Sequence, residues 1–284
     1  QFLNLKEDEY DVFIDSSIEN GYLTYGEYYR QGEKKEEILI SCHTCHPSLC
    51  NDNLSGTVLA AFLAKCLSQV SLEYSYRFLF IPGTIGSITW LCLNESKVSK
   101  IKHGLVAACV GDSGKFTYKK SRQGNAEIDR AVVNVLKNSG QNYEVINFIP
   151  FGYDERQYCS PGFNLPVGCL MKTPHGQYSQ YHTSADNLDF VKPEYLADSF
   201  SIYLSVFDIL ENNKKYINQN PRCEPQLGKR GLYQTTGGQK DRKQRELAML
   251  WVLNLSDGSN TLLDISDKSG LTFDLIKDAA DALS

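Results

Sequence analysis

The chain has 284 residues, of which 42% are hydrophobic and 22% are charged, and its formal net charge is −5. This length allows one large domain and a small one, and the negative charge gives no electrostatic basis for general nucleic-acid binding. No run of about 18 apolar residues predicts a membrane span, no signal-peptide pattern opens the chain, and nine scattered cysteines favour a reducing, cytoplasmic setting.

Strand-like and helix-like segments alternate along the first 213 residues. The apolar patterns predict strands at 36–42, 74–81, 104–112, 143–150 and 164–172. Helices are predicted at 53–69, 85–95, 126–139 and 193–213. This alternation indicates an α/β fold, with a mostly parallel mixed sheet and helices on both of its faces.

After residue 213 the sequence becomes polar, with prolines, glycines and basic residues, as is typical of a linker. Three short helices separated by glycine-containing turns then predict a helix-turn-helix or winged-helix module. We expect an α/β domain at 1–218, a linker at 219–240 and the small domain at 241–284. Because the chain begins without Met and close to a strand-like stretch, we also expect the α/β domain to lack its first part.

The last predicted helix is acidic, with Asp274, Asp278 and Asp281 against a single Lys277. A helix that reads DNA must approach phosphates, so this composition disfavours nucleic acid as a partner. We expect the small domain to pack within the chain, or to contact another protein or a second copy.

The most informative segment is SCHTCHPSLCNDNLSG, residues 41–56. His43 and His46 lie at the end of a buried strand, and Asp52 directly precedes a predicted helix. Ligands of open α/β sheets bind beyond the carboxyl ends of the strands, and imidazole with carboxylate suits zinc. The helix start would hold the Asp52 carboxylate ionised. This segment therefore predicts a metal site.

The same segment is compatible with three other roles. The spacing from Cys42 to His46 matches the C-x-x-C-H pattern of haem attachment, but no export signal accompanies it. A structural zinc bound through Cys42 and Cys45 lacks a second ligand pair to complete it. Asp52 is also a suitable residue to cap the helix that follows it.

Four motifs in fixed order, CHPSLCNDNLSG, PGTIGS, GYDERQYCSPG and YHTSAD, resemble a bacterial family of aminopeptidase-like proteins often named after polysaccharide biosynthesis. The resemblance covers nearly the whole chain, including WVLNLSDG in the tail. NDNLSG is also similar to the D-N-x-S-G motif of zinc aminopeptidases. The resemblance implies a hydrolase that uses one or two zinc ions to cleave an amide bond in a small peptide or a modified sugar.

The resemblance also implies metal ligands. Asp52 stands at the metal-bridging position, Asp112 at the acid after the next core strand, and His182 at the last histidine ligand. His46 or His43 would supply the first imidazole, and we prefer His46 because it lies within CHPS.

Residues around these ligands are implied as well. Asp186 would orient His182, and Asp154 and Glu155 lie where the aminopeptidases shape the substrate pocket. Arg156 would contact an anion. Ring side chains would wall the pocket: Tyr153, Tyr181 and His175.

One departure from the aminopeptidases concerns catalysis. They carry a Glu-Glu pair after the second core strand, whose first member is the general base, whereas Gly83 and Thr84 occupy that place here. The group that should accept a proton from water is therefore missing. Glu155 would replace it if its loop folds over the metal, and its neighbour Asp154 is the second candidate catalytic residue. Otherwise the domain is a catalytically weak metal-binding or scaffold domain.

Overall fold

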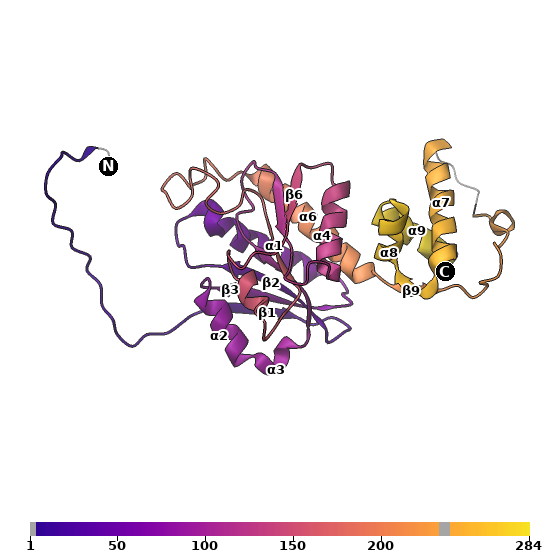
Figure 1. Cartoon of the computed structure of the whole chain (residues 1–284), viewed down its shortest axis with the longest axis horizontal. Coiled ribbons are helices and arrows are strands. Elements are labelled where there is room, and N and C mark those ends of the chain that lie inside the picture. The colour runs from indigo at the N-terminus through magenta and orange to yellow at the C-terminus, as the bar shows by residue number, and fades with distance from the viewer. Residues whose placement is uncertain (1–3, 233–238) are drawn as a thin grey trace.

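The computed structural model describes residues 4–232 and 239–284. Figure 1 shows an α/β body, a smaller helical unit and an extended N-terminal segment that leads away from the body. The body contains a seven-stranded sheet in the order β1-β3-β2-β4-β7-β5-β6. The predicted fold class is confirmed.

The strands of this sheet are β1 (Gly26–Arg30), β2 (Glu37–His43), β3 (Ser75–Ile81), β4 (Ile101–Ala107), β5 (Phe116–Lys119), β6 (Tyr143–Ile146) and β7 (Val167–Met171). β2 pairs in parallel with β3 and β4, and β4 with β7. β1 and β5 each run antiparallel to a neighbour. The carboxyl ends of the four central strands therefore lie along one edge of the sheet.

The helices of the body are α1 (Gly56–Leu67), α2 (Ile85–Leu93), α3 (Glu95–Val98), α4 (Glu127–Asn138), α5 (Glu155–Tyr158) and α6 (Pro193–Asn212). Alternate residues of the strands face opposite sides. Ile38 and Ile40 join the hydrophobic cluster of α1, α4 and α6. Leu39 joins the cluster that includes Trp90 of α2 and Tyr158 of α5. Figure 1 shows the same two layers.

The start of α1 differs from the prediction in a way that shapes the site. Residues 50–55 form a wide turn, η2 (Cys50–Ser55), in which Asp52 and Asn53 have non-helical backbone angles. The regular helix therefore begins at Gly56 rather than at residue 53. A side chain at Gly56 would overlap the carbonyl oxygen of Ala107, so glycine lets the turn pass close to the end of β4.

The small domain contains α7 (Gln239–Leu255), α8 (Leu262–Ser269) and α9 (Phe273–Leu283), which confirms the predicted winged-helix region. β8 (Lys215–Ile217) pairs with β9 (Asp257–Thr261) as its small sheet. The 3-10 helix η3 (Leu227–Arg230) lies within the expected linker, and residues 233–238 of that linker lie outside the described residues.

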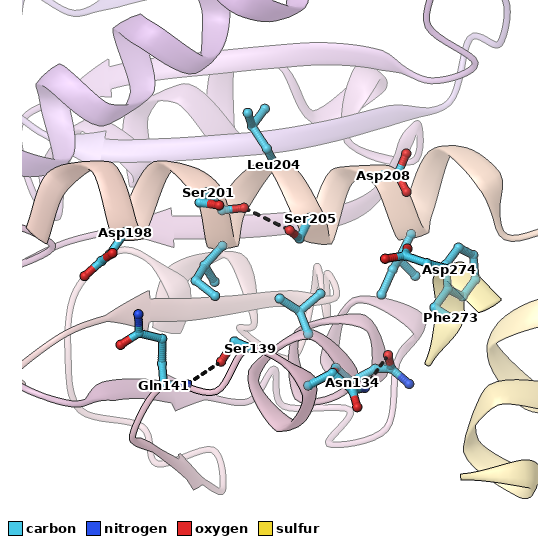
Figure 2. A pocket seen from close by; sticks show the side chains of 14 residues that line it. Asn134, Ser139, Gln141, Asp198, Ser201, Leu204, Ser205, Asp208, Phe273 and Asp274 are labelled. Carbon is cyan, nitrogen blue, oxygen red and sulfur yellow. Dashed lines mark hydrogen bonds between the residues drawn. The ribbon is translucent and has the colours of Figure 1, made fainter. Parts of the chain in front are cut away.

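The helix-turn-helix unit packs against the body. Arg130 of α4 pairs with Asp264 at 2.8 Å and with Asp267 at 2.7 Å, both on α8. Lys277 of α9 lies 3.8 Å from Asp208 of α6. A cavity of about 470 Å³ lies between α4, α6 and α9, with Asp274 at its rim (Figure 2). Helix α9 thus contacts the body through its one lysine.

Candidate metal centre

Four segments meet at the carboxyl edge of the sheet. His43 is the last residue of β2, Asp52 lies in the wide turn that follows, and His182 comes from the loop after β7. Tyr153 lies in the loop before α5. The parallel order of β2, β4 and β7 brings these segments together, because each strand delivers its following loop to the same edge.

The Asp52 carboxylate is completely buried and is the centre of the site. His43 Nε2 lies 2.7 Å from its Oδ1, and the Tyr153 hydroxyl donates to the same oxygen at 2.7 Å. His182 Nε2 lies 3.0 Å from Oδ2, and His46 Nδ1 lies 3.3 Å from it. Three imidazoles therefore converge on one carboxylate.

The electrostatics favour an ionised Asp52. Burial alone would raise its pKa, but the hydrogen bond and charge of His43, the hydrogen bond from Tyr153 and the charge of His46 together lower it to about 2. Burial, with Cys109 and Asp52 nearby, raises the pKa of the Tyr153 phenol, so this hydroxyl stays a neutral donor. An anionic acceptor surrounded by imidazoles is the donor set of a divalent metal site.

The geometry fits such an ion. Ligand atoms of His43, His46 and Asp52 all lie within 4.8 Å of one another. His182 reaches the same carboxylate, and its ring packs edge-on against that of His46 at 4.8 Å. Both His43 and His46 contact Asp52, so the geometry retains both as candidate ligands instead of selecting His46.

Asp186 binds the backbone of the wide turn. Its two oxygens accept the backbone N–H groups of Asn51 at 2.6 Å and Asp52 at 3.0 Å. Its carboxylate is turned towards the wide turn, and the expectation that it orients His182 stays a prediction. It fixes the backbone on which Asp52 is carried.

Asp112 lies outside the cluster. Its carboxylate accepts hydrogen bonds from Asn51 Nδ2 at 3.0 Å, Thr173 Oγ1 at 2.6 Å and Gly114 N at 2.7 Å. Both oxygens thus accept hydrogen bonds from neutral donors, and the role of Asp112 as a metal ligand stays a prediction. It holds Asn51, the residue before Asp52, in place.

Asp154 lies next to Gly83, where the resemblance to the aminopeptidases leads us to expect a glutamate. A side chain added at Gly83 would meet Asp154 Oδ2 at 3.8 Å and His43 Cβ at 3.0 Å. Ser87 Oγ lies 2.7 Å from Asp154 Oδ1, whereas Oδ2 is buried and accepts no hydrogen bond from the described residues. Burial raises the pKa of Asp154 to about 6, against the lowering effects of Ser87 and His43. A carboxylate from another loop thus approaches the vacant position.

The Glu155 side chain is directed to Lys119 and not to Asp52 and its three histidines. Its carboxylate is completely buried and forms an ion pair with Lys119, the last residue of β5. The expected role of Glu155 as the general base stays a prediction, and of the two candidate catalytic carboxylates Asp154 lies nearer to Gly83. The sequence does not predict a role for Lys119, because the four-residue strand β5 that ends at this residue was not predicted.

Ring side chains surround the cluster in a continuous series. Tyr153 stacks on His43 with ring centres 4.3 Å apart, and His175 packs against Tyr153 at 4.7 Å. Tyr181 stacks on His182 at 3.9 Å. The predicted pocket residues Tyr153, Tyr181 and His175 thus lie beside the candidate ligands. Arg156 is on α5, where its Nε is buried without a hydrogen-bond partner among the described residues, and its contact with an anion stays a prediction.

The raised pKa of Asp154 makes a prediction about stability. Between its ordinary value of 3.8 and about 6 the native protein binds more protons at this group than the unfolded chain. The protonated Asp154 carboxyl therefore makes its full contribution to the free energy of unfolding below pH 3.8. This contribution is lost as the pH rises through 6. We compare the free energy of unfolding of Asp154→Asn with that of wild type. We expect the difference to shift in favour of the variant by about 2 kcal/mol as the pH rises from 4 to 7.5. Urea unfolding at both pH values measures this, and a constant difference would contradict it.

Comparison with known proteins places this geometry in context. A family model described as Domain of unknown function (DUF4910) matches residues 9–213, and one described as winged helix-turn-helix matches residues 214–284. A curated protein of Clostridium acetobutylicum, provisionally named polysaccharide biosynthesis protein with aminopeptidase-like domain, is 58% identical over 283 residues. The alignment covers 100% of this chain and 65% of that relative, so the chain spans less than two thirds of the relative's length.

Solved structures resemble the chain at two levels. A crystal structure of a provisional peptidase from Clostridium acetobutylicum is 56% identical and superposes with a TM-score of 0.91, covering 99% of this chain and 64% of that one. A zinc aminopeptidase from Bacillus subtilis is 15% identical and superposes with a TM-score of 0.54, covering 66% of this chain and 49% of its own. The second likeness concerns the fold alone.

Proposed function

The chain belongs to the family described as Domain of unknown function (DUF4910), and on this premise we propose that it is a zinc-dependent hydrolase of aminopeptidase type. Its substrate would contain an amide bond in a small peptide or a modified sugar. One observation supports the proposal most strongly: three imidazoles converge on the buried, ionised carboxylate of Asp52. Burying a carboxylate is costly, and such a cluster is typical of metal binding.

His43, His46, Asp52 and His182 would hold the metal. A zinc ion bound there would supply Lewis acidity, which polarises a carbonyl oxygen and lowers the pKa of water. Asp186 and Asn51 would stabilise the position of Asp52. Asp186 accepts the backbone N–H of Asn51, and the Asn51 side chain donates to Asp112.

The chain's own residues supply the remaining functions. Asp154 would accept a proton, because its Oδ2 is buried, lacks a donor among the described residues and lies beside the position of the missing glutamates. The neutral Tyr153 hydroxyl would donate a hydrogen bond to an oxygen that develops negative charge. His175 and Tyr181 would form walls that position the substrate and exclude water.

The biological setting is also part of the proposal. The name of the Clostridium acetobutylicum relative suggests a link to polysaccharide biosynthesis, which makes a modified sugar a candidate substrate beside a small peptide. The nine cysteines are all free thiols, in agreement with a cytoplasmic location. Among the described helices, none is both long and apolar enough to cross a membrane.

The alternative is a metal-binding or scaffold domain with little catalytic activity. The replacement of the glutamate pair by Gly83 and Thr84 favours it. Metal binding is common to both functions, and hydrolysis separates them.

We expect the purified protein to contain one or two zinc ions per chain after zinc reconstitution. Plasma mass spectrometry on protein prepared without a metal-binding tag measures the content, with His182→Ala as the variant that should lose metal. The loaded protein is then assayed against aminoacyl and N-acylated amino-sugar substrates. Stoichiometric zinc without hydrolysis would favour the alternative, and protein without zinc would exclude the zinc hydrolase and leave a scaffold domain.

A further inference from the structure

A buried ion pair underlies the loop that carries Tyr153 and Asp154. Lys119 ends β5 and is 2% exposed, and Glu155 begins α5 and is 0% exposed. The ammonium and the carboxylate are in direct contact. The pair lies at the C-terminal end of the loop, one residue beyond Asp154.

The same ammonium also holds the N-terminal half of the loop. Lys119 Nζ donates a hydrogen bond to the carbonyl of Phe151 at 2.7 Å and a longer one to that of Ile149 at 3.4 Å. One cation therefore binds the loop on both sides of Tyr153 and Asp154. Tyr153 and Asp154 lie between these two points of contact. Tyr153 contacts Asp52, and Asp154 contacts Ser87.

The backbone of the loop is adapted to this arrangement. Gly152 has a φ of +147°, a conformation that L side chains rarely adopt. A Cβ atom at this position would overlap both the Glu155 carboxylate and the Lys119 ammonium. Glycine thus allows the loop to pass directly over the ion pair.

Stability alone does not account for such a pair. Two apolar side chains of similar volume often stabilise a protein as well as a buried ion pair does, because both charges must be removed from water. Directional hydrogen bonds to two carbonyls, with one carboxylate held by charge, instead specify the position of a segment. The residues so positioned are the two that approach Asp52 and Gly83 from this loop.

We propose that Lys119 is a positioning residue, which acts through Glu155 and the loop carbonyls to hold Tyr153 and Asp154 at the metal cluster. This inference rests on the proposed function for its catalytic meaning, whereas the restraint itself is a property of the loop. Lys119 touches no candidate metal ligand in the contacts of the described residues.

Hydrogen–deuterium exchange tests the restraint in the full chain. The double variant Lys119→Met/Glu155→Gln removes both charges together, because Lys119→Met alone leaves a buried carboxylate unpaired and endangers folding. We expect amides at 149–154 to exchange about tenfold faster in the double variant, with unchanged exchange in β2 and β4. Unchanged loop exchange would overturn the proposal, and so would equal acceleration throughout the chain, which a merely structural role produces.

Lys172→Met is the matched control. Lys172 is also a buried lysine, but its ammonium packs over Phe116 at 4.5 Å and lies 3.9 Å from Asp198, away from the loop. Its loss should leave exchange at 149–154 unchanged. Zinc content separates this inference from the proposed function: the candidate ligands lie outside the loop, so the double variant should retain as much zinc as wild type.

Discussion

Asp52→Ala should abolish stoichiometric zinc binding, whereas Asp112→Ala should only weaken it. Asp52 is the carboxylate on which His43, His46 and His182 converge, and its removal leaves three imidazoles without an anion between them. Asp112 contacts Asn51 and Thr173 instead. Residues that position a metal ligand through hydrogen bonds typically contribute about 10- to 100-fold to metal affinity.

Zinc titration with a chromophoric competitor measures both variants. We expect no saturable site in Asp52→Ala, and a site of unchanged stoichiometry but lower affinity in Asp112→Ala. Circular dichroism shows whether each variant is folded, which is required because both carboxylates are buried. Loss of stoichiometric zinc in a folded Asp112→Ala protein would restore Asp112 as a ligand and contradict the arrangement described above.

This contrast shows what the sequence contains and what it does not. The alternation of strands and helices locates most elements of the body because apolar periodicity is local. Helix α6, predicted at 193–213, spans Pro193–Asn212. Its start was predictable because proline favours the first turn of a helix. Strand β5 was not predicted because FTYK is only four residues long and is flanked by lysines, so it shows no clear apolar pattern.

The candidate site was predictable where a motif carries its own ligands. His43, His46 and Asp52 lie within ten residues of one another, and His182 stands in a distinct motif. The partners of Asp112, Asp186 and Glu155 were not predictable in the same way. The contacts of these residues with Asn51 and Lys119 join segments far apart in the chain, and only the sheet order brings those segments together.

Asp154→Asn should lower the turnover number of the zinc-loaded enzyme by about 10²- to 10⁴-fold, the usual contribution of a general base. The amide keeps the size of the side chain but cannot accept a proton. Zinc content should not change, because Asp154 lies beside the cluster and not among its candidate ligands. Steady-state kinetics on the best substrate of the panel measures the effect.

Ser87→Ala provides the matched control, because it alters the environment of Asp154 without removing the carboxylate. Ser87 Oγ lies 2.7 Å from Asp154 Oδ1, and this contact lowers the pKa that burial raises to about 6. If Asp154 accepts the proton, the rate increases with pH as this group ionises, and the loss of Ser87 moves that increase to higher pH. Turnover at high pH should then approach that of wild type. A Ser87→Ala profile that superposes on the wild-type profile, together with full activity of Asp154→Asn, would exclude Asp154 as the group that accepts the proton.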